Sequence, residues 1–272
     1  MKTHDDVATP VAAPQLDEEW LSEWLRQEHL DPERLRAARE RFEQSRFRSV
    51  ALDDFLRDDV MDSLAHFLTS DAKRVEKHML YGSAEEGAAD FGFVTKEKWL
   101  DAEPRRRLSR FGLMRGLPSE APPSALLMAL RLRDDLGCRL TPQMMTFLRL
   151  HLALSNPRFT RVWETVTGLP LGLADIRQVN IMRRGDFIGP HDDFYANRRL
   201  TVLLYVAPGW TEDLGGSLTF VAPDGSSESI PVRHNRLVLF EVSKTIKHQV
   251  EPIEEAAGDR QRVMLGGSVN NA

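Results

Sequence analysis

The chain has 272 residues, a formal net charge of -5 at pH 7 and a single cysteine, Cys138. Proteins that bind DNA or RNA usually show a strong basic bias, so the charge argues against nucleic acid as a direct partner. The chain contains no run of about 18 apolar residues, and its N-terminus lacks the pattern of a signal peptide. One cysteine cannot form an internal disulfide. We therefore expect a cytoplasmic protein that does not enter a membrane and that is long enough for one large domain.

The N-terminal part of the chain predicts a tail followed by two helices. Residues 1–15 show no periodicity and read as a disordered tail. Residues 16–46 read as a helical extension, because apolar residues at 16, 20, 21, 24, 25 and 30 form one amphipathic stripe and Asp31-Pro32 begins a second helix. Trp20 and Trp24 lie one turn apart on the stripe. They either form a homodimer or partner surface or dock on the flank of the chain's own domain.

Residues 47–272 read as one α+β domain. Its first part predicts a strand within 47–56 and helices near 58–68, 124–136, 142–154 and 159–166. Eight strand-like runs follow, separated by turn sequences and beginning near residues 176, 189, 199, 217, 227, 236, 247 and 261. Eight short strands indicate a jelly roll. We therefore expect a double-stranded β-helix core at about 176–270 with the N-terminal helices packed on it.

The chemistry-bearing stretch precedes the third of these runs. In an extended backbone, His191 and Asp193 project to the same side while Asp192 projects to the other. One imidazole and one carboxylate form two-thirds of the facial triad that holds Fe(II) and leaves other positions open. The third ligand must come from elsewhere, and His248, near the start of a later alternating run, is the natural choice. Arg262 begins the last run and places a guanidinium at the start of that strand.

The order of these residues resembles a known family. A His-x-Asp pair, a histidine about fifty to sixty residues later and an arginine about a dozen residues beyond it are used by the Fe(II)/2-oxoglutarate dioxygenases. The chain resembles their prolyl 4-hydroxylase-like branch and looks similar to the ribosomal-protein prolyl hydroxylases. Two features depart from the branch: Met182 stands where relatives often carry a tyrosine that touches the cosubstrate, and Gly266-Gly267-Ser268 replaces a bulkier aromatic ending. The matching motifs are Gly185 to His191, Arg199 to Tyr205, Trp210, Gly215 to Leu218 and Asn235 to Phe240.

The resemblance implies a ligand set and a reaction. His191, Asp193 and His248 would bind Fe(II), and Arg262, helped by the Tyr205 hydroxyl, would bind 2-oxoglutarate. With O2, and with ascorbate as an allowed reductant, the protein would hydroxylate an unactivated C–H bond and release succinate and CO2. The substrate would be a prolyl or other residue of a peptide or protein, a free amino acid or an amino-acyl intermediate.

Two questions stay open from the residues alone. Three polar residues are expected near the opening of the jelly roll: Asn180, Arg198 and Arg199. They either contact substrate or are strand-edge groups paired with solvent. Two other functions also remain: a non-catalytic jelly-roll module for metal binding or interaction, and a zinc-type metal hydrolase with the same triad. Neither alternative explains an arginine on the last strand beside the third ligand.

Overall fold

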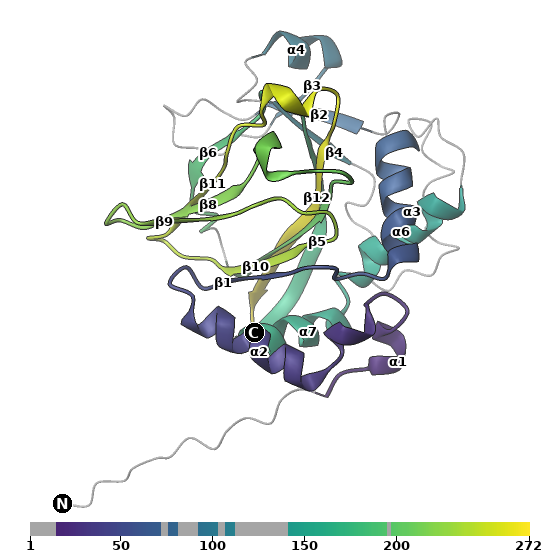
Figure 1. Ribbon diagram of the computed structural model, residues 1–272, viewed down its shortest axis with the longest axis vertical. Coiled ribbons are helices and arrows are strands. Elements are labelled where there is room, and N and C mark those ends of the chain that lie inside the picture. The colour runs from purple at the N-terminus through teal and green to yellow at the C-terminus, as the bar shows by residue number, and fades with distance from the viewer. Residues whose placement is uncertain (1–14, 72–75, 81–91, 103–106, 112–140, 195–196) are drawn as a thin grey trace, which may run out of the picture.

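Two antiparallel sheets dominate the computed structural model, which describes residues 15–71, 76–80, 92–102, 107–111, 141–194 and 197–272. The larger sheet has the order β1 (Ser49–Leu52), β10 (Leu237–Glu241), β7 (Arg198–Val206), β12 (Arg262–Asn271), β5 (Leu171–Met182), β4 (Arg107–Phe111), β2 (Glu76–Leu80) and β3 (Gly92–Val94). The smaller sheet has the order β6 (Ile188–His191), β11 (Lys247–Val250), β8 (Leu218–Val221) and β9 (Ser227–Ile230). Figure 1 shows the smaller sheet facing β5 and β12.

The jelly-roll prediction is confirmed. Seven of the eight predicted runs begin within one residue of an observed strand, from β6 to β12. The first predicted run corresponds to β5, which begins at Leu171, earlier than the predicted residue 176. Pairing with β12 along most of its length accounts for the longer strand. The strand predicted within 47–56 is β1, which pairs with β10. Strands β2, β3 and β4 extend the larger sheet beyond β5 and were not predicted.

Most of the helices pack on one face of the larger sheet. The helices are α1 (Glu18–Leu21), η1 (Gln27–His29), α2 (Pro32–Gln44), α3 (Asp58–His66), η2 (Phe67–Asp71), α4 (Lys96–Asp101), α6 (Pro142–Ala153), α7 (Pro157–Thr167), η6 (Glu212–Leu214) and η7 (Glu255–Ala257). Helices α1, α2, α3, α6 and α7 pack on that face, whereas η6 and η7 border the inner side. Figure 1 shows α1, α2 and α7 at one end of the sheet and α3 and α6 along its side. The helix predicted near 124–136 lies outside the described residues. Within the described part, no helix has both the length and the apolar character to span a membrane.

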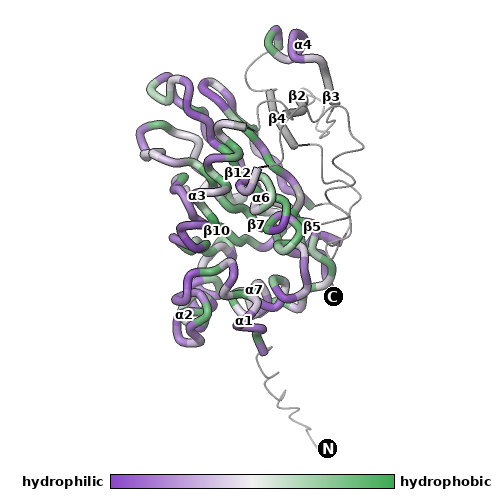
Figure 2. Tube along the Cα trace, turned by 90° about the vertical axis from the view of Figure 1, so that its right-hand side faces the viewer, coloured by the Kyte–Doolittle hydropathy of each residue, from purple (hydrophilic) through white to green (hydrophobic). Residues whose placement is uncertain are grey.

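Strand alternation divides the apolar residues into two cores. On β7, Leu200, Val202 and Leu204 pack with the helices, whereas Leu203 and Tyr205 face the smaller sheet. The outer core joins the helices to the larger sheet, and the inner core fills the space between the sheets. Figure 2 shows the result as green runs along β7, β10 and β12 and mostly purple colour on α2. The inner core is where a jelly roll holds a ligand.

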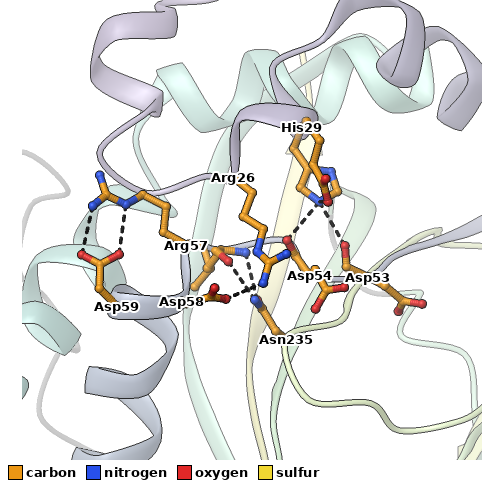
Figure 3. Close-up of polar contacts among 10 residues, drawn as sticks. Arg26, His29, Asp53, Asp54, Arg57, Asp58, Asp59 and Asn235 are labelled. Carbon is orange, nitrogen blue, oxygen red and sulfur yellow. Dashed lines mark hydrogen bonds and ion pairs between the residues drawn. The ribbon is translucent and has the colours of Figure 1, made fainter.

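The single helix predicted over residues 16–30 is wrong. Helix α1 ends at Leu21, and the chain then pairs with the segment before α3: Leu25 forms a bridge with Leu56, and the Arg57 N–H donates to the Trp24 carbonyl. Tertiary pairing has replaced the local helix preference. Figure 3 shows this junction, with Arg26 paired to Asp58 at 2.5 Å.

The tryptophan stripe packs on the chain's own domain, and Trp20 is only partly buried there. Trp24 is buried, and the Trp20 ring meets the Phe159 ring of α7 edge-on at 5.7 Å. Trp20 and Trp24 also contact each other, with ring centroids 6.3 Å apart. Helix α2 completes this layer by burying Leu35, Ala38 and Phe42.

Candidate metal and cosubstrate site

Strands β6 and β11 bring the two predicted histidine ligands face to face. His191, the last residue of β6, is the direct antiparallel partner of His248 on β11, and the two ring centroids are 4.2 Å apart. Directly opposed residues of an antiparallel pair project from the same face, so the register alone makes the imidazoles converge. The His248 ring is further confined by Phe240, whose ring centroid lies 4.8 Å away.

Asp193 completes the group by a route that differs from the predicted one. The chain is not extended there: β6 ends at His191, and Asp193 adopts a positive φ of 44°. The carboxylate nevertheless lies with Oδ2 3.5 Å from His248 Nε2 and Oδ1 3.8 Å from His191 Nε2. One ligand atom from each of the three residues lies within 4.8 Å of the others. The predicted triad is therefore assembled in the structure.

The protonation states suit a divalent cation. His191 Nδ1–H donates to the Gly189 carbonyl at 2.9 Å, which leaves the Nε2 lone pair directed to the site. Burial, together with the neighbouring His248, lowers the pKa of His191 and favours the neutral ring. Burial raises the pKa of Asp193, but the hydrogen bond and charge of His248, with His191 and Arg198, outweigh it and lower that pKa to about 2. Two imidazole nitrogens and one carboxylate oxygen form the donor set of a non-heme iron site.

A buried guanidinium lies in the same inner core. The Arg262 side chain is 1% exposed, and its three contacts are all neutral: Nε donates to the Gly216 carbonyl at 2.8 Å, Nη2 donates to Tyr205 Oη at 3.2 Å, and Nη1 lies 3.5 Å from Met182 Sδ. Within the described ranges, no carboxylate lies within ion-pair distance of Arg262. Burial lowers the pKa of Arg262, yet a guanidinium stays charged in proteins. An unpaired buried charge with spare donors indicates a site for an anion.

Comparison with known proteins agrees with this geometry. Residues 177–267 match the model of the 2OG-Fe(II) oxygenase superfamily, and this range contains the triad and Arg262. The matched region is a 2OG-Fe(II) oxygenase domain. Its fold also occurs in solved structures: a 2OG-Fe(II) oxygenase family oxidoreductase from Burkholderia pseudomallei has a TM-score of 0.52 at 16% identity and covers 87% of this chain and 90% of that one.

Further similar proteins are a solved structure and two curated relatives. A Trichoplax adhaerens prolyl hydroxylase, solved with a hypoxia inducible factor peptide, has a TM-score of 0.56 at 13% identity and covers 90% of this chain and 92% of that one. Prolyl 3-hydroxylase OGFOD1 of Mus musculus is 38% identical over 83 residues, which are 28% of this chain and 15% of the relative. The Xenopus laevis protein of that name is 38% identical over 69 residues, 23% of this chain and 14% of the relative. This chain thus spans only a small part of the length of these curated relatives.

The three residues predicted to contact substrate have different surroundings in the structure. Asn180 is buried on β5 opposite Met264 of β12. Arg198 Nη1 lies 3.4 Å from Asp193 Oδ1, so this arginine contacts a predicted metal ligand. Arg199 Nη2 lies 2.9 Å from Glu241 Oε1. Contact with substrate remains a prediction for all three.

Sequence reasoning missed two contacts at this site. Gly216 reads as part of a turn, yet its carbonyl accepts the hydrogen bond from Arg262 Nε, 46 residues away. Arg198 reads as a residue near the opening of the jelly roll, yet it pairs with the Asp193 carboxylate. The only local signal was the Gly215-Gly216 pair itself, because two glycines before an apolar strand indicate a backbone that requires unusual φ angles or close approach.

Proposed function

We propose that the protein is an Fe(II)- and 2-oxoglutarate-dependent hydroxylase that acts on a prolyl residue, or a similar amino-acid residue, of a peptide or protein. The proposal is carried by the buried Arg262, which has no anionic partner among the described residues and lies in the same inner core that confines the triad. A triad alone suits several metal enzymes. A triad with a guanidinium reserved for an anion suits a cosubstrate that has both a metal-binding end and a distal carboxylate.

Different residues of the chain would bind the metal ion and the cosubstrate. His191, Asp193 and His248 would hold the ion from one side, and Arg262 with the Tyr205 hydroxyl would bind and orient the distal carboxylate of 2-oxoglutarate. Bound iron, with 2-oxoglutarate and O2, supplies the oxidation that inserts one oxygen atom into a C–H bond, with succinate and CO2 as products. Phe220 and Phe240, buried beside His248, exclude water from this side of the site.

The substrate class rests on the relatives. The OGFOD1 proteins are named prolyl 3-hydroxylases, and the Trichoplax enzyme is a prolyl hydroxylase with a bound peptide. Both support a prolyl residue in a polypeptide over a free amino acid or an amino-acyl intermediate. A zinc hydrolase or a non-catalytic module is disfavoured, because neither requires an anion site at Arg262.

The test proceeds in two steps. Without O2, addition of Fe(II) and then 2-oxoglutarate should produce a visible metal-to-ligand charge-transfer band in the wild type but not in His191→Ala or His248→Ala. With O2, the wild type should form succinate, and a prolyl-containing peptide set should show a mass gain of one oxygen atom. Absence of the band in the wild type, or wild-type succinate formation by both histidine variants, would contradict the proposal.

Two smaller proposals rest on the sequence. The protein is cytoplasmic, and a homodimer forms through the N-terminal helices, where Trp20 remains partly accessible. Light scattering of the wild type and of Trp20→Ala measures the mass in solution. A monomeric wild type would refute the dimer.

A further inference from the structure

We propose that Gly216 is a positioning residue for Arg262, and that its lack of a side chain aims the guanidinium at the distal carboxylate of 2-oxoglutarate. The inference rests on the proposed function. Gly216 adopts a φ of 75°, and a Cβ built there would lie 2.9 Å from Arg262 Cδ and 3.3 Å from Nε. These atoms are in the middle of the arginine side chain, so a methyl group cannot be accommodated by moving only its tip.

The guanidinium is confined on its other sides as well. Its Cζ lies 4.8 Å from the centroid of the Tyr205 ring, and Met182 Sδ contacts Nη1. Tyr205 and Met182 are both fully buried. Any group added at position 216 would therefore rotate or shift the fork within a closed space. Bidentate recognition of a carboxylate requires the planar fork to be held in one orientation, so a small displacement removes hydrogen bonds.

The backbone around Gly216 cannot retreat to make room. Its N–H donates to the Pro252 carbonyl at 3.0 Å. Gly215, with a φ of 71°, approaches the same oxygen so closely that a Cβ would lie 2.3 Å from it. The Gly215 carbonyl in turn accepts a hydrogen bond from Trp210 Nε1 at 3.0 Å. The backbone of this turn is therefore held in place, so the Arg262 side chain must shift instead.

The expected defect is specific to one end of the cosubstrate. 2-Oxoglutarate has a distal carboxylate, whereas 2-oxopentanoate has the same 2-oxo acid end and a methyl group in its place. Loss of charge-assisted hydrogen bonds weakens binding by about ten- to 150-fold. Gly216→Ala should therefore weaken the binding of 2-oxoglutarate by at least about tenfold. Its affinities for 2-oxopentanoate and for Mn²⁺ should stay within about twofold of the wild-type values.

Gly225 and Gly209 provide matched controls. They also have positive φ angles, 85° and 67°, but a Cβ at either position would meet nothing within 4 Å. Gly225→Ala and Gly209→Ala therefore share the backbone strain of Gly216→Ala without the contact to Arg262. Affinities are measured without O2, with Fe(II) saturating, from the visible absorption band or by calorimetry, and the melting temperature is recorded for each variant.

Arg262→Ala completes a double-mutant cycle. With the arginine removed, the added methyl group meets only Ile253 Cγ1, at 3.3 Å, and no longer meets a group that binds the cosubstrate, so Gly216→Ala should produce no further loss of 2-oxoglutarate affinity. If Gly216→Ala alone fails to fold, Gly216→Ala/Arg262→Ala should fold, because the contact that prevents folding is gone. Failure of both to fold would show that the glycine serves the turn and would overturn the proposal.

The remaining outcomes are equally decisive. Wild-type 2-oxoglutarate affinity in Gly216→Ala, or an equal loss for both 2-oxo acids, would overturn the positioning role. Failure of the proposed function appears earlier and separately: the wild type itself would then show no preference for 2-oxoglutarate over 2-oxopentanoate.

Discussion

Arg262 should contribute little to the stability of the ligand-free protein. Replacement of buried charged groups by apolar residues of similar volume is neutral or stabilising by about 1–4 kcal/mol. Arg262→Met has a similar length and removes a desolvated charge, but it also removes the hydrogen bonds to Gly216 and Tyr205. Each such bond contributes about 1 kcal/mol. We therefore expect the stability of the ligand-free variant to lie within about 2 kcal/mol of the wild type, in either direction.

The cosubstrate should stabilise the wild type more than the variant. At a 2-oxoglutarate concentration 100 times its Kd, binding stabilises the wild type by about 2.7 kcal/mol. If Arg262→Met weakens binding ten- to 150-fold, the same concentration stabilises the variant by only about 0.3–1.4 kcal/mol. The variant should therefore gain at least about 1 kcal/mol less stability from the ligand than the wild type.

Urea unfolding with Mn²⁺, with and without 2-oxoglutarate, measures both quantities. Arg260→Ala is the control, because Arg260 is exposed near the Gly258-Asp259 turn. This substitution should change neither the ligand-free stability nor the stabilisation by 2-oxoglutarate. A ligand-free Arg262→Met that is more than about 2 kcal/mol less stable than the wild type would show that the guanidinium is satisfied by its neutral neighbours. Equal ligand-induced stabilisation of the variant and the wild type would refute the assignment of Arg262 to the distal carboxylate.

Three further outcomes are expected. His248→Ala should abolish stabilisation by Mn²⁺, measured as a shift in melting temperature, and an unchanged shift would remove His248 from the site. A fragment that begins at Phe47 should fail to fold, because it lacks Leu21, Leu25 and Phe42, all at most 1% exposed, and a fragment with a cooperative transition that binds iron would contradict this. Asp53 accepts two hydrogen bonds from Arg236, which lower its pKa below 3.8. A carboxylate whose pKa is lowered by folding stabilises the fold above its unfolded pKa, so stability should fall as the pH drops below about 4. Asp53→Asn should reduce that fall by about 1 kcal/mol or less. The same pH dependence in Asp53→Asn and the wild type would contradict the last prediction.

Strand positions and the ligand set were accessible from the sequence because both depend on local patterns. Alternation along residues 199–205 places Leu203 and Tyr205 on one face, and a histidine near the start of a later strand was sufficient to nominate His248. The pairing of His248 with His191 then follows from the order of strands in a jelly roll. These inferences needed no knowledge of contacts between distant residues.

The missed features all depend on long-range contacts. Residues 16–30 have a helical stripe, but pairing of Leu25 with Leu56 ends the helix, and no pattern near Leu25 indicates that partner. The positive φ of Asp193 is equally hidden, since aspartate adopts both extended and left-handed conformations. Gly216 reads as a turn residue until Arg262 is placed against it.

The direct pairing of His191 with His248 also has a dynamic consequence. In the described part of the smaller sheet, β6 lies at an edge and β11 is its neighbour, so β6 can open without disturbing the strands beyond β11. An ion held by His191 and His248 would join the two strands through their side chains, and opening would require its release. Amide hydrogens of β6 should therefore exchange with solvent rapidly in the metal-free protein and slowly once Mn²⁺ is bound, whereas those of β7 should exchange slowly in both.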